Sequence, residues 1–315
     1  MKITDKFKAD VVLGLCMLVW GATFVVVQDA LAYASVMVFL AARFLLAAGI
    51  LAVVYFGVLR KMERGALWAG GLMGVCLFSG YICQTVGLKF TTPSKAAFLN
   101  GSSTIWVPVM MSAAGMRRVG GWVWAGVVTA MAGLYLVAIP STGFSHLNVG
   151  DVLSVGSAIS FAFHIIVVER YSHKFAVTTL SFVQIALTGI LALAAVPVAR
   201  AAGWEAPRFA WNGYLAFALA LTAIGCTVLA FSGQVWAQRH TSATHAAILF
   251  TLEPVFAAIT SYLVLHERLG PRALTGAVLI LGAILLAELK GPVQAPPDSE
   301  GGEGSGVAAG IGDGR

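Results

Sequence analysis

A carboxylate and a proline stand side by side inside a long apolar run near the C-terminal end of the chain. Glu253 and Pro254 interrupt residues 241–265, a run long enough to cross a lipid bilayer. A charge at membrane depth is energetically costly and usually faces a protein interior or a water-filled cavity. Glu253 could exchange a proton or balance a substrate amine. It could equally help to satisfy the helix that Pro254 breaks, because proline cannot donate to the carbonyl of Phe250.

Two other ionisable residues lie inside apolar runs. Arg43 could pair with a carboxylate or hold an anionic substrate group, or it could reach outward to water or bind carbonyls at a helix end. His164 could titrate or hydrogen-bond a substrate, although a single histidine among apolar neighbours is also readily satisfied in a packed core. The residue types alone leave both alternatives open for each side chain.

Several uncharged residues complete the set of candidates. Tyr81 precedes Gln84 by about one helical turn, as Phe231 precedes Gln234, so each pair shares a helical face. Such faces could line a cavity or simply pack and hydrogen-bond between helices. The candidate substrate-binding residues are Trp20, Thr23, Tyr81, Gln84, Asn100, Ser103, His164, Phe231 and Gln234, and the candidate coupling or gating residues are Arg43, Pro108, Glu253 and Pro254.

The elements that must position these residues are ten apolar runs, each predicted to be a membrane-spanning helix. They cover residues 10–30, 36–59, 66–89, 94–115, 121–139, 150–169, 177–199, 211–238, 242–265 and 271–289. An even number of spans places both termini on one side, and the excess of Lys and Arg on that side predicts the cytoplasm. Residues 1–9 would form a cytoplasmic N-terminus. Residues 291–315, rich in Pro, Gly, Ser and acid, would form a disordered cytoplasmic tail.

The two halves of the chain repeat each other, at residues 10–140 and 150–290. Gln84 aligns with Gln234 in one ungapped register, and Arg43 aligns with Gln184 in another. Each unit holds five spans, and an odd number forces the second copy to be inverted across the membrane. Asn100–Thr104 interrupts the first half near the place where Glu253–Pro254 interrupts the second. Broken helices in matching positions point to a transporter's binding site, and we predict bends at Ser103–Pro108 and Glu253–Pro254.

Composition narrows the class of protein. Of 315 residues, 59% are hydrophobic and only 11% are charged, which indicates a polytopic membrane protein. The 20 Lys and Arg exceed the 14 Asp and Glu, but they form no dense patch that would favour a nucleic-acid partner. The four cysteines lack metal-ligand spacing, and there is no Walker-type loop for ATP. We therefore expect no metal, no cofactor and no nucleic acid.

Short motifs along the chain resemble the drug/metabolite transporter superfamily and, within it, the EamA family. They are V-W-G-A-T-F (19–24), A-A-R-F in the second span, G-L-K-F-T-T-P-S-K-A-A-F-L (87–99) with the later Pro108, and L-E-P-V-F-A-A (252–258) followed by H-E-R-L (266–269). The resemblance covers about residues 10 to 290 and implies a ten-helix inverted-repeat fold around a central cavity. It also implies movement of amino acids, other small metabolites or drugs, often outward. Arg117-Arg118 departs from the family's Glu-Arg, which Glu267-Arg268 keeps, so span four lacks that carboxylate.

We therefore expect a secondary transporter, not an enzyme, that exports a small metabolite or drug across the cytoplasmic membrane by alternating access. Its partners would be the substrate, such as an amino acid or a related amphipathic compound, and the lipid bilayer, with a homodimer left open. An importer or exchanger of the same fold is an alternative. The other alternative is a membrane-embedded hydrolase using Gly101-Ser102-Ser103 with His164, but no nucleophile elbow or H-E-x-x-H motif supports it.

Overall fold

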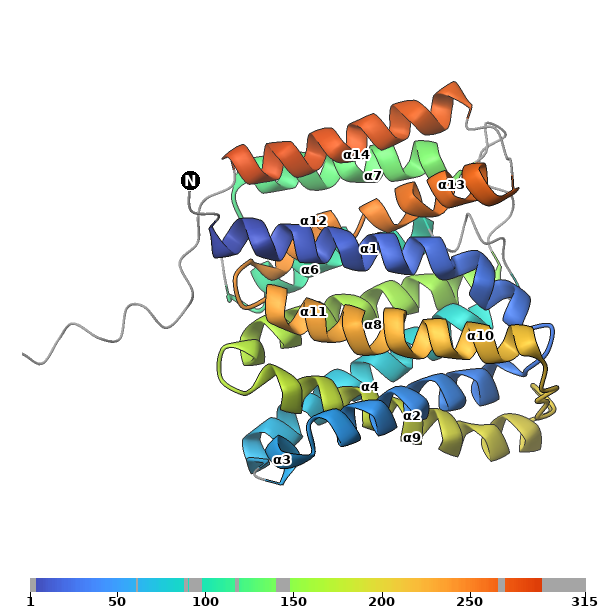
Figure 1. Ribbon diagram of the computed structural model, residues 1–315. Helices are drawn as coiled ribbons and strands as arrows, with labels where there is room; N and C mark the ends of the chain where they lie inside the picture. The colour runs from blue at the N-terminus through green and yellow to red at the C-terminus, as the bar shows by residue number, and fades with distance from the viewer. Residues whose placement is uncertain are drawn as a thin grey trace, which may run out of the picture.

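The computed structural model describes residues 4–60, 62–87, 90, 98–116, 119–139, 148–265 and 270–290. Within these ranges the regular elements are helices that lie side by side in one bundle (Figure 1). They are α1 (Asp5–Ala30), α2 (Val36–Val54), α3 (Phe56–Leu59), α4 (Arg64–Gly87), α6 (Ser103–Ala113), α7 (Gly121–Ala138), α8 (Val149–Ser172), α9 (Val177–Ala201), α10 (Gly213–Leu221), η1 (Thr222–Leu229), α11 (Ala230–Ala237), α12 (Ala243–Leu249), α13 (Leu252–Leu265) and α14 (Pro271–Lys290).

These helices confirm the predicted all-helical membrane fold. Five of the helical segments in the described part of the chain are long and apolar enough to cross a membrane, namely Val36–Val54, Arg64–Gly87, Val149–Ser172, Val177–Ala201 and Gly213–Ala237. Shorter apolar helices cover Gly121–Val137, Ala243–Ala257 and Pro271–Leu286. The predicted tail, the Arg117-Arg118 pair and the Glu267-Arg268 pair lie outside the described residues.

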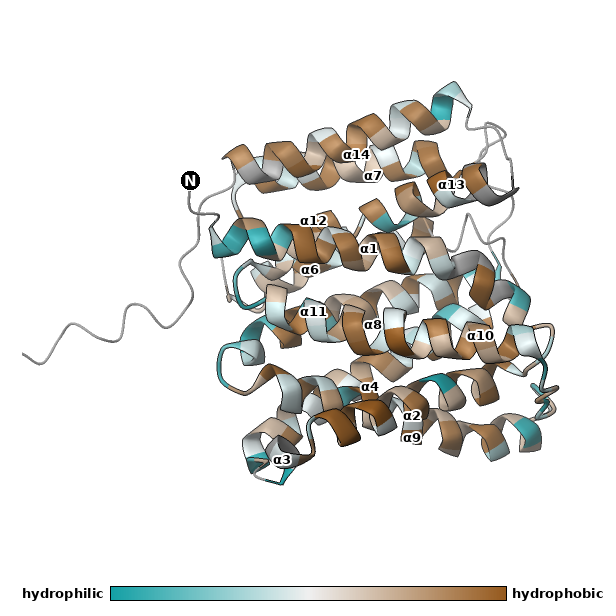
Figure 2. Ribbon diagram, viewed as in Figure 1, coloured by the Kyte–Doolittle hydropathy of each residue, from teal (hydrophilic) through white to brown (hydrophobic). Residues whose placement is uncertain are grey.

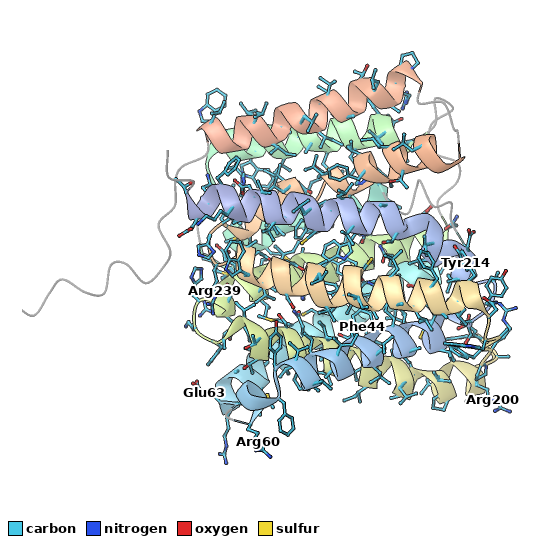
Figure 3. All side chains as sticks on the ribbon, viewed as in Figure 1. Phe44, Arg60, Glu63, Arg200, Tyr214 and Arg239 are labelled. Atoms are coloured by element: carbon cyan, nitrogen blue, oxygen red, sulfur yellow. The ribbon has the colours of Figure 1, made fainter. Side chains whose placement is uncertain are left out.

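The outer surface of the bundle is apolar along its length and polar at its ends. Figure 2 shows brown, apolar residues along the helices and teal, polar residues gathered toward the two ends. Arg60 and Glu63 lie at one end and Arg200 and Tyr214 at the other (Figure 3). Outward-facing Val53 is 79% exposed, which is unfavourable in water but suits contact with lipid. This polarity matches a bundle whose mid-section lies within hydrocarbon.

Two of the extensive contacts between the halves join equivalent helices. Helix α7 packs along α14 and α2 packs along α9, and each pair joins a helix to its counterpart in the other half. A Cβ added to Gly133 would lie 2.6 Å from the carbonyl oxygen of Gly276, and one added to Gly276 would lie 2.5 Å from that of Gly133. Helix α1 begins, and α14 ends, at the same end of the bundle (Figure 1). This arrangement agrees with the inverted repeat expected from the sequence.

Two helical spans are broken at equivalent depths. A turn at Ser102 precedes α6, and a turn at Phe250 and Thr251 separates α12 from α13. In both breaks a hydroxyl satisfies a carbonyl three residues earlier: Ser102 donates to Leu99 at 2.5 Å and Thr251 donates to Ile248 at 2.6 Å. The turn at Ser102 lies within the expected interruption Asn100–Thr104, and the turn at Phe250 and Thr251 closely precedes the expected bend at Glu253–Pro254.

The breaks lie on the N-terminal side of the predicted bends. Pro108 sits inside α6, which continues through it, so no interruption occurs at Pro108 itself. Pro254 lies in the first turn of α13, and the break precedes it at Phe250–Thr251. In the ninth span the reason is that Pro254 cannot donate to the carbonyl of Phe250, so the helical hydrogen bonds are lost about a turn before the ring.

The eighth span contains a π-helix that the sequence did not predict. Residues Thr222–Leu229 form η1 between α10 and α11, whereas the counterpart α4 is α-helical from Arg64 to Gly87. A π-helix bonds each N–H to the carbonyl five residues earlier, and such segments often occur at functional sites. The two halves therefore differ in backbone geometry at this level of the bundle.

Candidate functional site

Aromatic rings from both halves meet in the middle of the bundle. The ring of Phe231 on α11 lies 5.0 Å from Trp20 on α1, 6.3 Å from Phe44 on α2, 6.4 Å from Tyr81 on α4 and 6.1 Å from His164 on α8, measured between centroids. Figure 3 shows Phe44 in the interior, between the helices. Five spans thus contribute to one contact network, and Phe231 is its centre.

Further rings extend this network to the broken ninth span. Phe250, at the turn between α12 and α13, lies 6.1 Å from Trp20, and Phe161 of α8 lies 5.5 Å from Tyr81. We call Trp20, Phe44, Tyr81, Phe161, His164, Phe231 and Phe250 the central aromatic cluster. Phe44 is fully buried, whereas Trp20, Tyr81 and Phe250 keep part of their surface accessible.

Arg43 is buried beside the cluster and is stabilised from two directions. Its side chain is 4% exposed, and its Nε donates to the hydroxyl of Thr227 at 2.8 Å. The guanidinium carbon lies 5.3 Å from the Phe44 ring centroid and 5.4 Å from that of Tyr81, which is cation–π distance. The Thr227 hydroxyl donates in turn to the carbonyl of Thr222, across the π-helix. The cation is therefore tied to the backbone of η1.

Side chains of α1 also bind the π-helical segment. The Trp20 indole nitrogen donates to the carbonyl of Cys226 at 2.8 Å. The Thr23 hydroxyl donates to the carbonyl of Val19 at 2.7 Å and lies 2.8 Å from the sulfur of Cys226. Thr23 is 6% exposed, so it holds α1 against η1 and offers little surface to a ligand.

Glu253 reaches the same region from the second half. It is half-buried and lies in the first turn of α13, where the N-terminal end of a helix favours negative charge. Glu253 and Arg43 both lie in the surroundings of Tyr81 and Cys226. These two charged residues, both among the described ones, form no direct ion pair with each other. A cation and an anion from different halves therefore share the surroundings of Tyr81 without neutralising each other by contact.

The backbone holds Glu253 close to α1. A Cβ on Gly21 would lie 2.5 Å from the Glu253 carbonyl oxygen and 2.9 Å from the nitrogen of Ala257. Only glycine permits this approach, because any larger residue would meet backbone atoms that cannot move independently. Gly21 thus positions the N-terminal turn of α13 beside Trp20.

Other predicted site residues lie outside the central aromatic cluster. Gln234 is 1% exposed and donates to Gln238 at 2.9 Å, so it lies in packed protein. Its repeat counterpart Gln84 is half-buried, so the two equivalent glutamines differ in burial. Asn100 accepts from Ser157 at 2.9 Å. Ser103 and Pro108 are buried on α6, and Pro254 follows Glu253 on α13.

His164 combines contact with the cluster and a fixed hydrogen bond. Its Nε2 lies 2.8 Å from Oε1 of Gln184, which is the repeat counterpart of Arg43. The candidate hydrolase residue Ser102 instead donates to Leu99 within its own turn. These hydrogen bonds provide no serine–histidine pair. The described residues also contain no group of three or more His, Cys, Asp or Glu side chains able to hold a metal ion.

The sequence interpretation missed Phe44, Phe161, Phe250 and Thr227. Phe44 follows the candidate residue Arg43 directly, and Phe250 aligns with the candidate residue Asn100 of the first repeat. Both could therefore have been selected from their positions in the sequence. Thr227 carried none, because its role depends on the π-helix that turns its hydroxyl toward Arg43.

Comparison with known proteins finds transporters by both the family model and the individual relatives. The model of the EamA-like transporter family matches residues 7–139 and again residues 148–289. An uncharacterized transporter of Archaeoglobus fulgidus is 32% identical over 290 residues, covering 90% of this chain and 87% of the relative. The uncharacterized transporter YvbV of Bacillus subtilis is 25% identical, covering 93% and 96%. A solved crystal structure at 15% identity superposes with a TM-score of 0.76, covering 90% of this chain and 98% of the other, which supports the fold alone.

Proposed function

Because the chain belongs to the EamA-like transporter family, we propose that it is a secondary transporter that exports a small metabolite across the cytoplasmic membrane by alternating access. The observation that carries the proposal is the buried cation Arg43 against the ring of Tyr81, with Glu253 of the other half in the first turn after the break of the ninth span. Charged groups at membrane depth are rare outside substrate or ion pathways.

The substrate class that fits this site is small and amphipathic, such as an amino acid, a related metabolite or a drug. Trp20, Tyr81 and Phe250 offer apolar ring faces, while Arg43 and Glu253 offer one charge of each sign. A ligand with an apolar body and a polar group could satisfy both kinds of contact.

Alternating access would use the two broken spans. The turns at Ser102 and at Phe250–Thr251 lie at equivalent depths in the two halves, and the second carries Glu253 directly after it. Discontinuous helices at the interface between repeats are the usual hinges and ligand-binding elements of inverted-repeat transporters. We place both termini in the cytoplasm, in accordance with the distribution of Lys and Arg.

The test is transport by the purified protein in liposomes. Liposomes with and without the protein are loaded with a mixture of small metabolites, and the external solution is sampled over time by mass spectrometry. The proposal expects at least one solute to appear outside, chemically unchanged, at a rate that depends on the protein. Import of an external solute or strict exchange would correct the direction. Appearance of a converted product, with no flux of any unchanged solute, would contradict the transporter function itself.

A further inference from the structure

A row of fully buried polar side chains lies between α8, α9 and α11, beside the central aromatic cluster. Ser181 and Gln184 of α9, Gln234 of α11, Gln238 directly after α11 and His164 of α8 are each 0–2% exposed. Burying polar groups among apolar helices is unfavourable unless each group finds a hydrogen-bond partner. Each of these side chains is therefore expected to have a hydrogen-bond partner.

Two short series of hydrogen bonds satisfy some of these buried polar groups. His164 Nε2 lies 2.8 Å from Gln184 Oε1, which joins α8 to α9. Gln234 Nε2 donates to Gln238 Oε1 at 2.9 Å, and Gln238 Nε2 donates to the carbonyl of Ile165 at 3.0 Å, which joins α11 to α8. Because His164 and Ile165 are consecutive, the two chains end next to each other on α8.

Three polar atoms of the same row remain without a hydrogen-bond partner in the part of the chain that the structure describes. They are Nε2 of Gln184, Oγ of Ser181 and Oε1 of Gln234. The first can only donate, the last can only accept, and the hydroxyl can do both. The set is complementary in donors and acceptors, yet its members do not bond directly to one another.

Two of the unpartnered atoms belong to residues about one turn away from the level of His164 and Gln184. Ser181 is one helical turn before Gln184 on α9, and Gln234 is one turn beyond the ring that meets His164. Helices α9 and α11 run in opposite directions, so both steps lead toward the end of the bundle at which α1 begins and α14 ends. Their sequence neighbours Leu180 and Val235 pack in one apolar cluster, which brings these two stretches together.

We propose that water molecules occupy this interface and bridge Gln184, Ser181 and Gln234, which gives the second half an internal hydrated site next to His164. A buried water is stable where it finds two to four polar partners, and these three atoms supply a matched set. Water-mediated bonds also re-form readily when helices shift, which a direct side-chain pair does not allow so easily.

The hydrated site is confined to the second half. In the repeat, Leu40 takes the place of Ser181 and Arg43 takes the place of Gln184. Leu40 is 4% exposed and packs in an apolar cluster, while Arg43 bonds to Thr227. Water bound in this way would lie only between the central aromatic cluster and the end of the bundle at which α1 begins and α14 ends. The inference concerns hydration and does not depend on which solute is transported.

X-ray hydroxyl-radical footprinting of the full-length protein in detergent tests this inference, because radicals formed at bound water oxidise the side chains beside it. His164 should be oxidised although it is 2% exposed. Phe39, which is 1% exposed within an apolar cluster, should remain unmodified. Equal absence of oxidation at His164 and Phe39 in the wild-type protein would overturn the proposal without any variant.

A double variant locates the source of the water. Ser181→Ala with Gln234→Leu removes two of the three bridging atoms and should reduce His164 oxidation to the level of Phe39. Ser154→Ala is the matched control, because Ser154 is equally buried on α8 but already donates to the carbonyl of Gly150. Unchanged His164 oxidation in a monodisperse double variant would mean that water reaches it from the aromatic cluster, which contradicts the proposed site. If the double variant aggregates, Ser181→Ala alone should lower the oxidation.

Discussion

At the scale of single residues, Arg43 and Glu253 come from opposite halves of the chain and lie in the surroundings of the same residue, Tyr81. Arg43 is held by the Thr227 hydroxyl and by two aromatic rings, so its charge is met inside the protein. Glu253 is half-buried at the first turn of α13, where only the helix terminus is known to favour its charge. Neutralising each residue should therefore have different consequences.

The first prediction concerns Glu253. Glu253→Gln keeps the shape of the side chain and its hydrogen bonds but removes ionisation. If Glu253 couples transport to protons, this variant should lose uphill transport driven by a pH gradient in liposomes while it retains substrate exchange. If its role is to support the broken helix, Gln should behave nearly normally and Glu253→Leu should lose folding or transport. Normal transport by Glu253→Leu would contradict both roles.

The second prediction concerns Arg43. Arg43→Gln copies the repeat counterpart Gln184 and can still donate to Thr227, whereas Arg43→Leu removes this donor and leaves the hydroxyl bonded only to the carbonyl of Thr222. A hydrogen bond made by a charged group contributes about 1.5–3 kcal/mol. We expect Leu to lower the yield of folded protein and the transport rate more than Gln does, as measured by fluorescence size-exclusion and liposome flux. Indistinguishable results for the two variants would show that the hydrogen bond is dispensable.

At the scale of helical elements, the π-helix of span eight is the feature that builds the site. It aims the Thr227 hydroxyl at Arg43 and presents the Cys226 carbonyl to the Trp20 indole. Both contacts cross from the first half of the chain to the second. The segment is thus stabilised by tertiary hydrogen bonds and not by a local sequence preference, since its residues are ordinary apolar ones with two threonines and a glycine.

The third prediction follows from this dependence. Trp20→Phe keeps an aromatic ring but removes the donor to Cys226, and it should lower the free energy of unfolding by about 1–2 kcal/mol. Trp68→Phe is the control, because Trp68 is 67% exposed on the regular helix α4. Thermal unfolding in detergent should separate the two variants. An equal melting temperature for both would mean that the indole bond does not support η1.

At the scale of the whole molecule, the contact of α7 with α14 joins two equivalent helices of the two halves, beside further contacts such as those of α4 with α8 and α9. The contact of α7 with α14 brings Gly133 and Gly276 so close that neither tolerates a Cβ without movement of backbone. The reciprocal geometry is what a two-fold relation between repeats produces. The same relation sets the two broken spans at equivalent depths.

The fourth prediction tests that contact. Gly276→Leu should destabilise the protein by roughly 1–3 kcal/mol or prevent its folding, because the added side chain meets the carbonyl of Gly133. Gly282→Leu on the same helix should be tolerated, since a Cβ there meets nothing within 4 Å. The yield of monodisperse protein and its melting temperature are the measurements. Tolerance of both substitutions would place the close contact elsewhere.

The fifth prediction concerns orientation in the membrane. A green fluorescent protein fused after Lys290 should fluoresce, because it folds in the cytoplasm, where we place both termini. An alkaline phosphatase fused at the same point should be inactive. The opposite pair of results would reverse the topology or show that a span had been miscounted.

The sequence alone determined the spans and the repeat, since the length of an apolar run and the register of polar residues such as Gln84 and Gln234 are local properties. It also identified Trp20, Tyr81, His164, Phe231, Arg43 and Glu253 as candidate site residues.

The tertiary structure decided which helix faces meet protein and where the helical geometry changes. Membrane helices are apolar on nearly every side, so no periodic face tells which side meets protein and which meets lipid. That is why Gln234 could not be separated from Gln84, and why the π-helix at Thr222–Leu229 appears only once neighbouring helices supply its hydrogen bonds.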